Sequence, residues 1–213
     1  MAPARTTADF LYHVVLITSP SEAKDPNEKV EQMRIFGSYT SIEKAKEAAH
    51  DTLTSLGYDK QLFTTYETEP HELEKLAPTQ GLGLAVYATT DDGSIFRVRI
   101  LTTPNTQHFT TDKDGRIPRE LYHVVQTNIN YDRDERKKPN ETNIEGAFET
   151  YADARKFAGT VLVSKEDGIT PSSYREYHVA APDAPDCGFA ENVLVHAVGE
   201  NGQNYLVSVI KAQ

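Results

Sequence analysis

The chain has 213 residues, a formal net charge of −10 and 38% hydrophobic residues. This apolar content is too high for an intrinsically disordered chain, and acidic groups spread along its whole length disfavour nucleic acid and anionic lipid as partners. The single cysteine, Cys187, excludes an intrachain disulfide and a cysteine-based zinc site, and without a signal-like or membrane-length apolar stretch we expect a cytoplasmic, or alternatively nuclear, protein.

The first predicted elements are two strands and a helix. Residues 10–18 are rich in Val, Ile, Leu and Tyr, as strands are, and a short strand is expected at 35–39 after a polar loop. A helix is predicted from Thr40 to Gly57, because Thr40 and Glu43 have capping-box spacing and Gly57 suits a left-handed C-cap. Apolar residues recur along it at helical spacing, namely Ile42, Ala45, Ala49, Leu53 and Leu56.

A hairpin ends this part of the chain. Residues 63–66 are expected to be partly extended, and two clear strands follow at 84–89 and 95–101. The turn between them is Asp91-Asp92-Gly93, and the Asp-Gly pair tolerates the positive φ values of a tight hairpin turn.

The same order of elements recurs in the second half, which indicates an internal duplication. Leu11-Tyr12-His13-Val14-Val15 returns as Leu121-Tyr122-His123-Val124-Val125. Later landmarks keep nearly the same offset, namely Gly37 with Gly146, Ala45 with Ala154, Ala49 with Ala158, Gly93 with Gly202 and Phe96 with Tyr205.

The sequence therefore predicts an α+β fold made of two copies of a β-β-α-β-β unit, each an antiparallel sheet with one helix packed on a face. We expect the first repeat at 8–104, a linker at 105–118 and the second repeat at 119–213. This plan resembles ferredoxin-like and dimeric α/β-barrel arrangements, with the two repeats as a pseudo-dimer. The resemblance concerns the fold and implies no function.

The last strand of each repeat differs on its outer face. Arg97 and Arg99 alternate with apolar residues in the first repeat, which predicts a solvated face. The corresponding row in the second repeat is Leu206, Ser208 and Ile210, which predicts a surface covered by another protein or by a second copy. Our leading hypothesis is a non-enzymatic protein that binds a protein partner or self-assembles through these three residues.

The alternative hypothesis is an enzyme or a small-molecule-binding protein. Its site would lie in a cleft between the repeats and would use His13 and His123 with Tyr12 and Tyr122. Neither histidine has an Asp or Glu beside it in the sequence to orient the imidazole as a general base, which favours a structural role in the sheet.

The other candidate groups carry weaker signals. His178 and His196 lack the spacing of metal ligands, and Gly81-Leu82-Gly83 lacks the third glycine of a dinucleotide fingerprint. Cys187 has no cationic neighbour in the sequence to activate its thiol. We therefore predict no metal and no cofactor.

Overall fold

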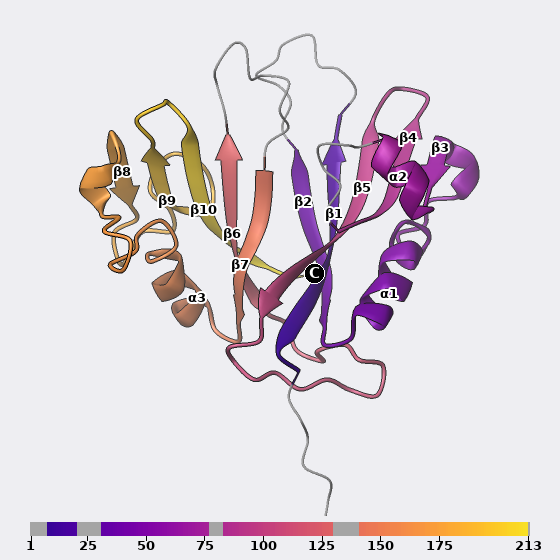
Figure 1. The fold of residues 1–213 in the computed structure, drawn as a ribbon, viewed down its shortest axis with the longest axis horizontal. Coiled ribbons are helices and arrows are strands. Elements are labelled where there is room, and N and C mark those ends of the chain that lie inside the picture. The colour runs from indigo at the N-terminus through magenta and orange to yellow at the C-terminus, as the bar shows by residue number, and fades with distance from the viewer. Residues whose placement is uncertain (1–7, 21–30, 77–82, 130–140, 213) are drawn as a thin grey trace, which may run out of the picture. The chain divides into compact units, whose positions relative to one another are not determined.

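The protein forms two compact units, Met1–Pro118 and Arg119–Ala212. The computed structural model describes residues 8–20, 31–76, 83–129 and 141–212. Each unit contains a five-stranded antiparallel sheet with helical segments beside it, as Figure 1 shows. The prediction of a two-unit α+β protein is confirmed at this level.

The first unit places its first and last strands side by side at the centre of the sheet, in the order β2-β1-β5-β4-β3. Its helix α1 contacts β1, β2, β4 and β5, and therefore lies across one face. The elements are β1 (Phe10–Ser19), β2 (Gln32–Tyr39), α1 (Ile42–Ser55), β3 (Phe63–Glu67), α2 (Pro70–Leu76), β4 (Leu84–Thr90) and β5 (Ile95–Pro104).

The second unit repeats this order as β7-β6-β10-β9-β8, with α3 against β6, β7, β9 and β10. The stretch at 63–66, which the sequence predicts as partly extended, becomes β3. Its counterpart in the second unit is β8, and each of the two is the fifth strand of its sheet. The elements of this unit are β6 (Tyr122–Ile129), β7 (Glu141–Phe148), α3 (Tyr151–Ala158), β8 (Glu176–Val179), β9 (Val193–Val198) and β10 (Asn204–Lys211).

The two sheets share a local irregularity. The register between β1 and β2 shifts between Val14 and Val15, beside the pair of Val14 with Gly37. The same shift follows the pair of Val124 with Gly146 in the second unit. A bulge at equivalent positions is expected when both units descend from one ancestral unit, because bulges tend to be kept within families.

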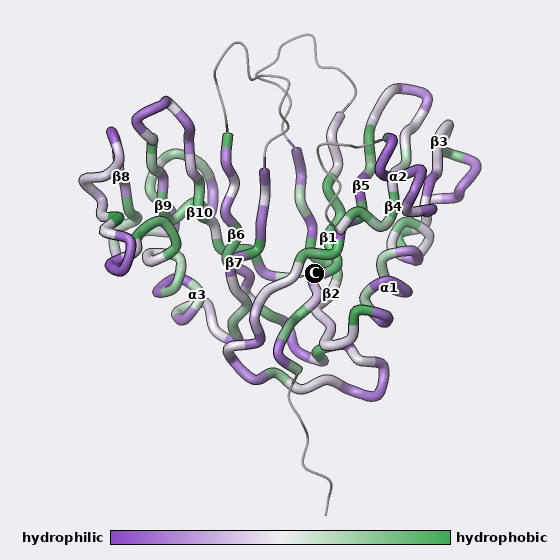
Figure 2. Tube along the Cα trace, viewed as in Figure 1, coloured by the Kyte–Doolittle hydropathy of each residue, from purple (hydrophilic) through white to green (hydrophobic). Residues whose placement is uncertain are grey.

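Each unit has its own core between helix and sheet. In the first unit, Ala45, Ala49 and Leu53 of α1 are fully buried against Val14 and Val98 of the sheet. In the second unit, Ala154 and Ala158 of α3 play the same part. Apolar and polar residues alternate along α1 and α3 in Figure 2, as expected for helices with one buried face.

The N-terminus of α1 differs by one residue from the prediction. Ser41, not Thr40, is the N-cap: its Oγ accepts a hydrogen bond from the Lys44 N–H at 3.3 Å and donates to the Glu43 carboxylate at 2.8 Å. The backbone N–H of Thr40 instead donates to the Gly115 carbonyl, which keeps Thr40 outside the helix.

The cap can be tested by two alanine substitutions. Ser41→Ala is expected to lower the free energy of unfolding by about 1 kcal/mol, because it leaves a helix N–H group without its side-chain acceptor. Chemical denaturation of the full chain measures the change. The substitution Thr40→Ala is the control, and a larger loss at Thr40 than at Ser41 would contradict the assignment.

The segment 105–118, predicted as a linker, is held along the first unit. The Asn105 side chain accepts from the Phe109 N–H at 2.8 Å and donates to the Ala8 carbonyl at 2.9 Å. The Ile117 N–H donates to the Ser38 carbonyl at 2.8 Å, and Phe109 and Ile117 are buried. The segment connects the units in sequence and forms part of the first one.

Among the described residues, no helix has both the length and the apolar character needed to cross a membrane.

Candidate functional site

His13, the first candidate of the enzyme hypothesis, lies inside a group of hydroxyls. Its Nδ1 is 2.7 Å from Ser38 Oγ and its Nε2 is 2.8 Å from Thr103 Oγ1, and all three side chains are buried. Tyr12 packs with the α1 core on the opposite face of the sheet. The structure therefore does not bring the Tyr12 phenol to the His13 imidazole.

His123 occupies the equivalent position in β6 and is fully buried. Burial lowers the pKa of this imidazole to about 4, while a hydrogen bond with the backbone of Leu121 acts in the opposite direction. Tyr122 packs with the α3 core and meets Tyr151 edge-on at 5.8 Å between ring centroids. An imidazole with so low a pKa is neutral at physiological pH and has no contact with bulk water.

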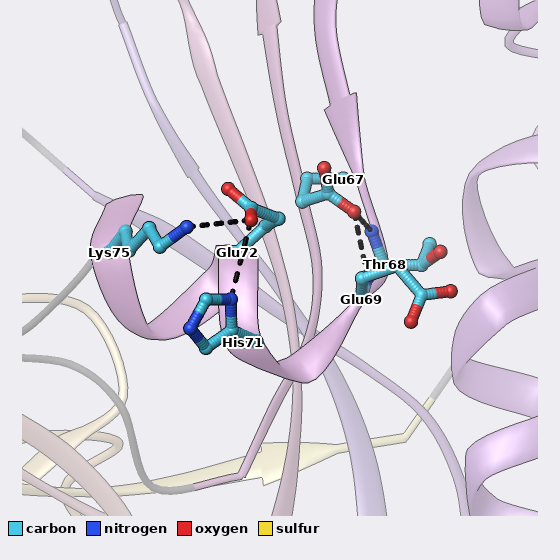
Figure 3. Close-up of polar contacts among 6 residues, drawn as sticks. All are labelled: Glu67, Thr68, Glu69, His71, Glu72 and Lys75. Carbon is cyan, nitrogen blue, oxygen red and sulfur yellow. Dashed lines mark hydrogen bonds and ion pairs between the residues drawn. The ribbon is translucent and has the colours of Figure 1, made fainter.

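A polar cluster surrounds the start of α2, as Figure 3 shows. The Glu67 carboxylate accepts from the backbone N–H groups of Thr68 and Glu69, each at 2.8 Å, and these bonds lower its pKa. The Glu72 carboxylate accepts from Lys75 Nζ at 2.8 Å. The Glu67 contacts shape the turn between β3 and α2, and the contact of Glu72 with Lys75 lies on the exposed surface of α2 itself. Both are structural roles.

The predicted binding residues lie on the sheet face of the second unit that turns away from α3. Leu206, Ser208 and Ile210 alternate along β10 with Val207 and Val209, which belong to the α3 core, and all three are half-buried. Cross-strand pairing extends this face sideways, because neighbours in register share a face. The resulting row runs from His178 to His196, Leu206 and Thr127.

An open pocket of about 380 Å³ lies on this face. Leu206 is one of its walls, and the other residues around it come from strands and from the loop before β9. The lining residues are Ile129, Glu176, Phe189, Ala190, His196, Val198, Asn204 and Leu206. Five of these described residues are apolar, and Glu176 is the charged one among them.

His196 is the buried polar group of this pocket, with 4% of its surface exposed. Its Nε2 lies 2.9 Å from Asn204 Oδ1, while Asn204 Nδ2 donates to the Gly202 carbonyl at 3.1 Å. The Asn204 oxygen must therefore be the acceptor, which places the imidazole proton on Nε2. His196 Nδ1 is left with a lone pair and has no hydrogen-bond partner among the described residues.

Phe189 covers the His196 ring. The two ring centroids are 3.7 Å apart. The His178 ring stacks with His196 at 5.9 Å between centroids and is tilted against Phe189 at 5.0 Å. Phe189 is nevertheless 49% exposed, so one side of its ring contacts His196 and the rest remains available to a ligand.

In the first unit, the position equivalent to Leu206 is occupied by the side chain of Arg97. Arg97 pairs with Ile17 across the sheet as Leu206 pairs with Thr127, and the next pair, Ile95 with Ser19, matches Asn204 with Ile129. The Arg97 guanidinium donates to the Ser19 hydroxyl and to the Glu31 carboxylate, the latter at 2.5 Å.

This ion pair corrects the prediction of a solvated face around Arg97. Only 6% of Arg97 is exposed. Sequence alternation alone assigns an arginine to solvent, but a carboxylate that meets the guanidinium compensates for the lost hydration. The two repeats therefore differ in another way than predicted: the Arg97 side chain occupies the position in the first unit, and the equivalent position at Leu206 in the second unit borders an open pocket.

The alternating pattern of β10 identified Leu206, but it missed the polar part of the pocket. The hairpin turn fixes the register that puts His196 opposite Leu206, so the sequence contained that signal. The position of Phe189 depends on the path of the loop before β9, which no periodic pattern describes. Among the residues that the structure describes, no group of three or more His, Cys, Asp or Glu side chains is placed to hold a metal ion.

Comparisons of the chain with protein-family models, with curated proteins and with solved structures return no match.

Proposed function

We propose that the protein is a non-enzymatic binding protein, and that a protein partner docks on the sheet face of Leu206, Ser208 and Ile210. The observation that carries the proposal is the pocket on this face of the second unit, whereas the first unit fills the equivalent place of its own sheet with Arg97. A half-buried apolar row beside a pocket is typical of a surface that an anchor side chain of a partner completes.

A protein occupant explains the extent of the surface better than a small metabolite does. The pocket is open, its wall Phe189 is 49% exposed, and the half-buried Ser208 and Ile210 continue the row of Leu206 along β10. A small molecule is normally buried over most of its surface, whereas a row of side chains that extends beyond an open pocket fits a partner with a central anchor and peripheral contacts.

The enzyme hypothesis with His13, His123, Tyr12 and Tyr122 is the weaker proposal. Both imidazoles are fully buried, and the His13 nitrogens lie beside neutral hydroxyls. A general base needs access to a substrate proton and an orienting group with a matched pKa. These side chains instead resemble buried polar groups whose hydrogen bonds are satisfied by the fold.

The finer prediction of a ferredoxin-like or dimeric α/β-barrel-like pseudo-dimer stays a proposal. The common strand order of the two sheets and the bulges beside Gly37 and Gly146 support it. The boundaries of the two repeats, 8–104 and 119–213, are proposed with it, and the segment 105–118 joins them in sequence.

The test is a selection from a random peptide library displayed on phage, with the full chain as bait. Peptides enriched on the native chain are expected to bind the variant Leu206→Arg at least about tenfold more weakly, because the longer and charged arginine side chain would occupy the surface that the peptides contact. Leu62→Arg is the matched control, because Leu62 is an exposed leucine of the first unit.

Circular dichroism of both variants checks that the fold is kept. Equal binding of the selected peptides to the native chain and to Leu206→Arg would refute the proposed surface. Sedimentation of the native chain alone identifies the other occupant: association that increases with concentration and disappears in Leu206→Arg would assign the surface to a second copy of this chain.

A further inference from the structure

We infer that the pocket at Leu206 receives the guanidinium group of an arginine side chain of the protein partner. The inference rests on the proposed function and adds the chemistry of the anchor residue. It follows from the hydrogen-bonding groups of the pocket, from its apolar walls and from the contents of the equivalent place in the first unit.

The polar groups of the pocket call for a hydrogen-bond donor. Glu176 contributes a carboxylate, which only accepts hydrogen bonds when ionised. His196, which lines the pocket, has a buried Nδ1 lone pair without a partner among the described residues, and an unsatisfied buried acceptor is costly. The Asn204 amide is already used by His196 Nε2 and by the Gly202 carbonyl.

The donor should carry a positive charge and a flat shape. Among the described residues of the lining, Glu176 is the charged one, and the chain as a whole carries a net charge of −10. The exposed part of the Phe189 ring offers a face on which a planar cation can stack. A guanidinium has several fixed donors, and its methylene stem suits apolar walls such as Ile129, Val198 and Leu206.

The first unit supplies an internal precedent. At the position equivalent to Leu206 its own Arg97 places a guanidinium on the sheet face, with Ser19 and Glu31 as acceptors. In the second unit a leucine replaces the arginine and Ile129 replaces Ser19, while the charged acceptor in the lining is the Glu176 carboxylate. The second unit thus presents a carboxylate without a guanidinium from β10.

The test uses N-acetyl-arginine amide as probe, with N-acetyl-citrulline amide as the neutral probe of nearly the same shape. Nuclear magnetic resonance of the full chain follows the methyl signals of Ile129 and Leu206 and the ring signals of His196. We expect all three residues to shift with the arginine probe, and the citrulline probe to bind about threefold more weakly, as expected for one partly exposed ion pair.

The variant Glu176→Gln is expected to remove the preference for arginine. Glu166→Gln, which changes the same charge at an exposed turn outside the pocket, is expected to keep it. Equal affinity for the two probes, no shift at the pocket, or an arginine preference that survives Glu176→Gln would each overturn the inference.

The peptide selection separates this inference from the proposed function. Enriched peptides that contain arginine and lose affinity for Leu206→Arg support both the arginine anchor and the proposed binding surface. Enriched peptides that depend on Leu206 and lack arginine contradict the anchor and leave the binding surface standing. Peptides that bind Leu206→Arg as well as the native chain contradict the surface itself.

Discussion

Acidification from about pH 7 to about pH 4.5 is expected to lower the free energy of unfolding by about 2 kcal/mol through His123 alone. Burial holds the pKa of its imidazole at about 4 in the folded protein, whereas an imidazole in the unfolded chain titrates near about 6.5. The unfolded state therefore binds more protons between these two values. The stabilisation is complete above the unfolded pKa and is lost as the pH falls toward the folded pKa.

The experiment compares the native chain with His123→Gln by urea denaturation at several pH values. Glutamine keeps a polar side chain and does not titrate, so the difference between the two pH profiles isolates His123. Glu145, whose pKa is raised by burial, responds to acid in the opposite sense but is present in both proteins. The control is His71→Gln, because His71 is exposed. Parallel profiles of the native chain and His123→Gln would contradict the prediction.

Gly83→Ala is expected to destabilise the first unit by about 3 kcal/mol or more, through backbone strain and steric overlap together. Gly83 has a φ of +79°, and its carbonyl accepts a hydrogen bond from the Ile100 N–H at 2.7 Å at the start of the β4–β5 pairing. A Cβ at this position would overlap the carbonyl oxygen of Ile100, which belongs to the backbone and cannot rotate away.

Gly57→Ala provides the matched control. Gly57 follows α1 with a φ of +86°, and a Cβ there would meet no atom within 4 Å. Only the strain of the left-handed backbone remains, which is worth about 1 kcal/mol. Thermal and urea unfolding of the two variants measure the difference. Similar losses of unfolding free energy in the two variants would show that the close approach of Gly83 to β5 does not contribute to stability.

The regular part of the fold could be predicted because its signals are local. Segments rich in Val, Ile, Leu and Tyr predicted the strands, the Asp-Gly pair predicted the hairpin at Gly93, and the match of Gly93 with Gly202 predicted the second hairpin. The cap of α1 was misplaced because Thr40 and Ser41 carry equivalent hydroxyls. The choice between them depends on the bond from Thr40 to Gly115, far along the chain.

The parts that were missed depend on contacts between distant residues or on short elements. Arg97 is buried because it meets Glu31, which is remote from it in sequence. The short helix α2 was not predicted, although Pro70 at its first position is a typical helix start and Leu73 anchors it in the core. The pocket needs Phe189, whose place over His196 is set by an irregular loop.

The central pairing of β1 with β5 and of β6 with β10 has a consequence for synthesis on the ribosome. In each unit the first strand can complete its pairing only after the last strand has been synthesised, because Phe10 pairs with Pro104 and Tyr122 pairs with Lys211. Until then, the nascent chain exposes an incomplete sheet with an open strand edge. Duplication limits this interval, because each unit closes within its own half and the first can fold while the second is still being translated.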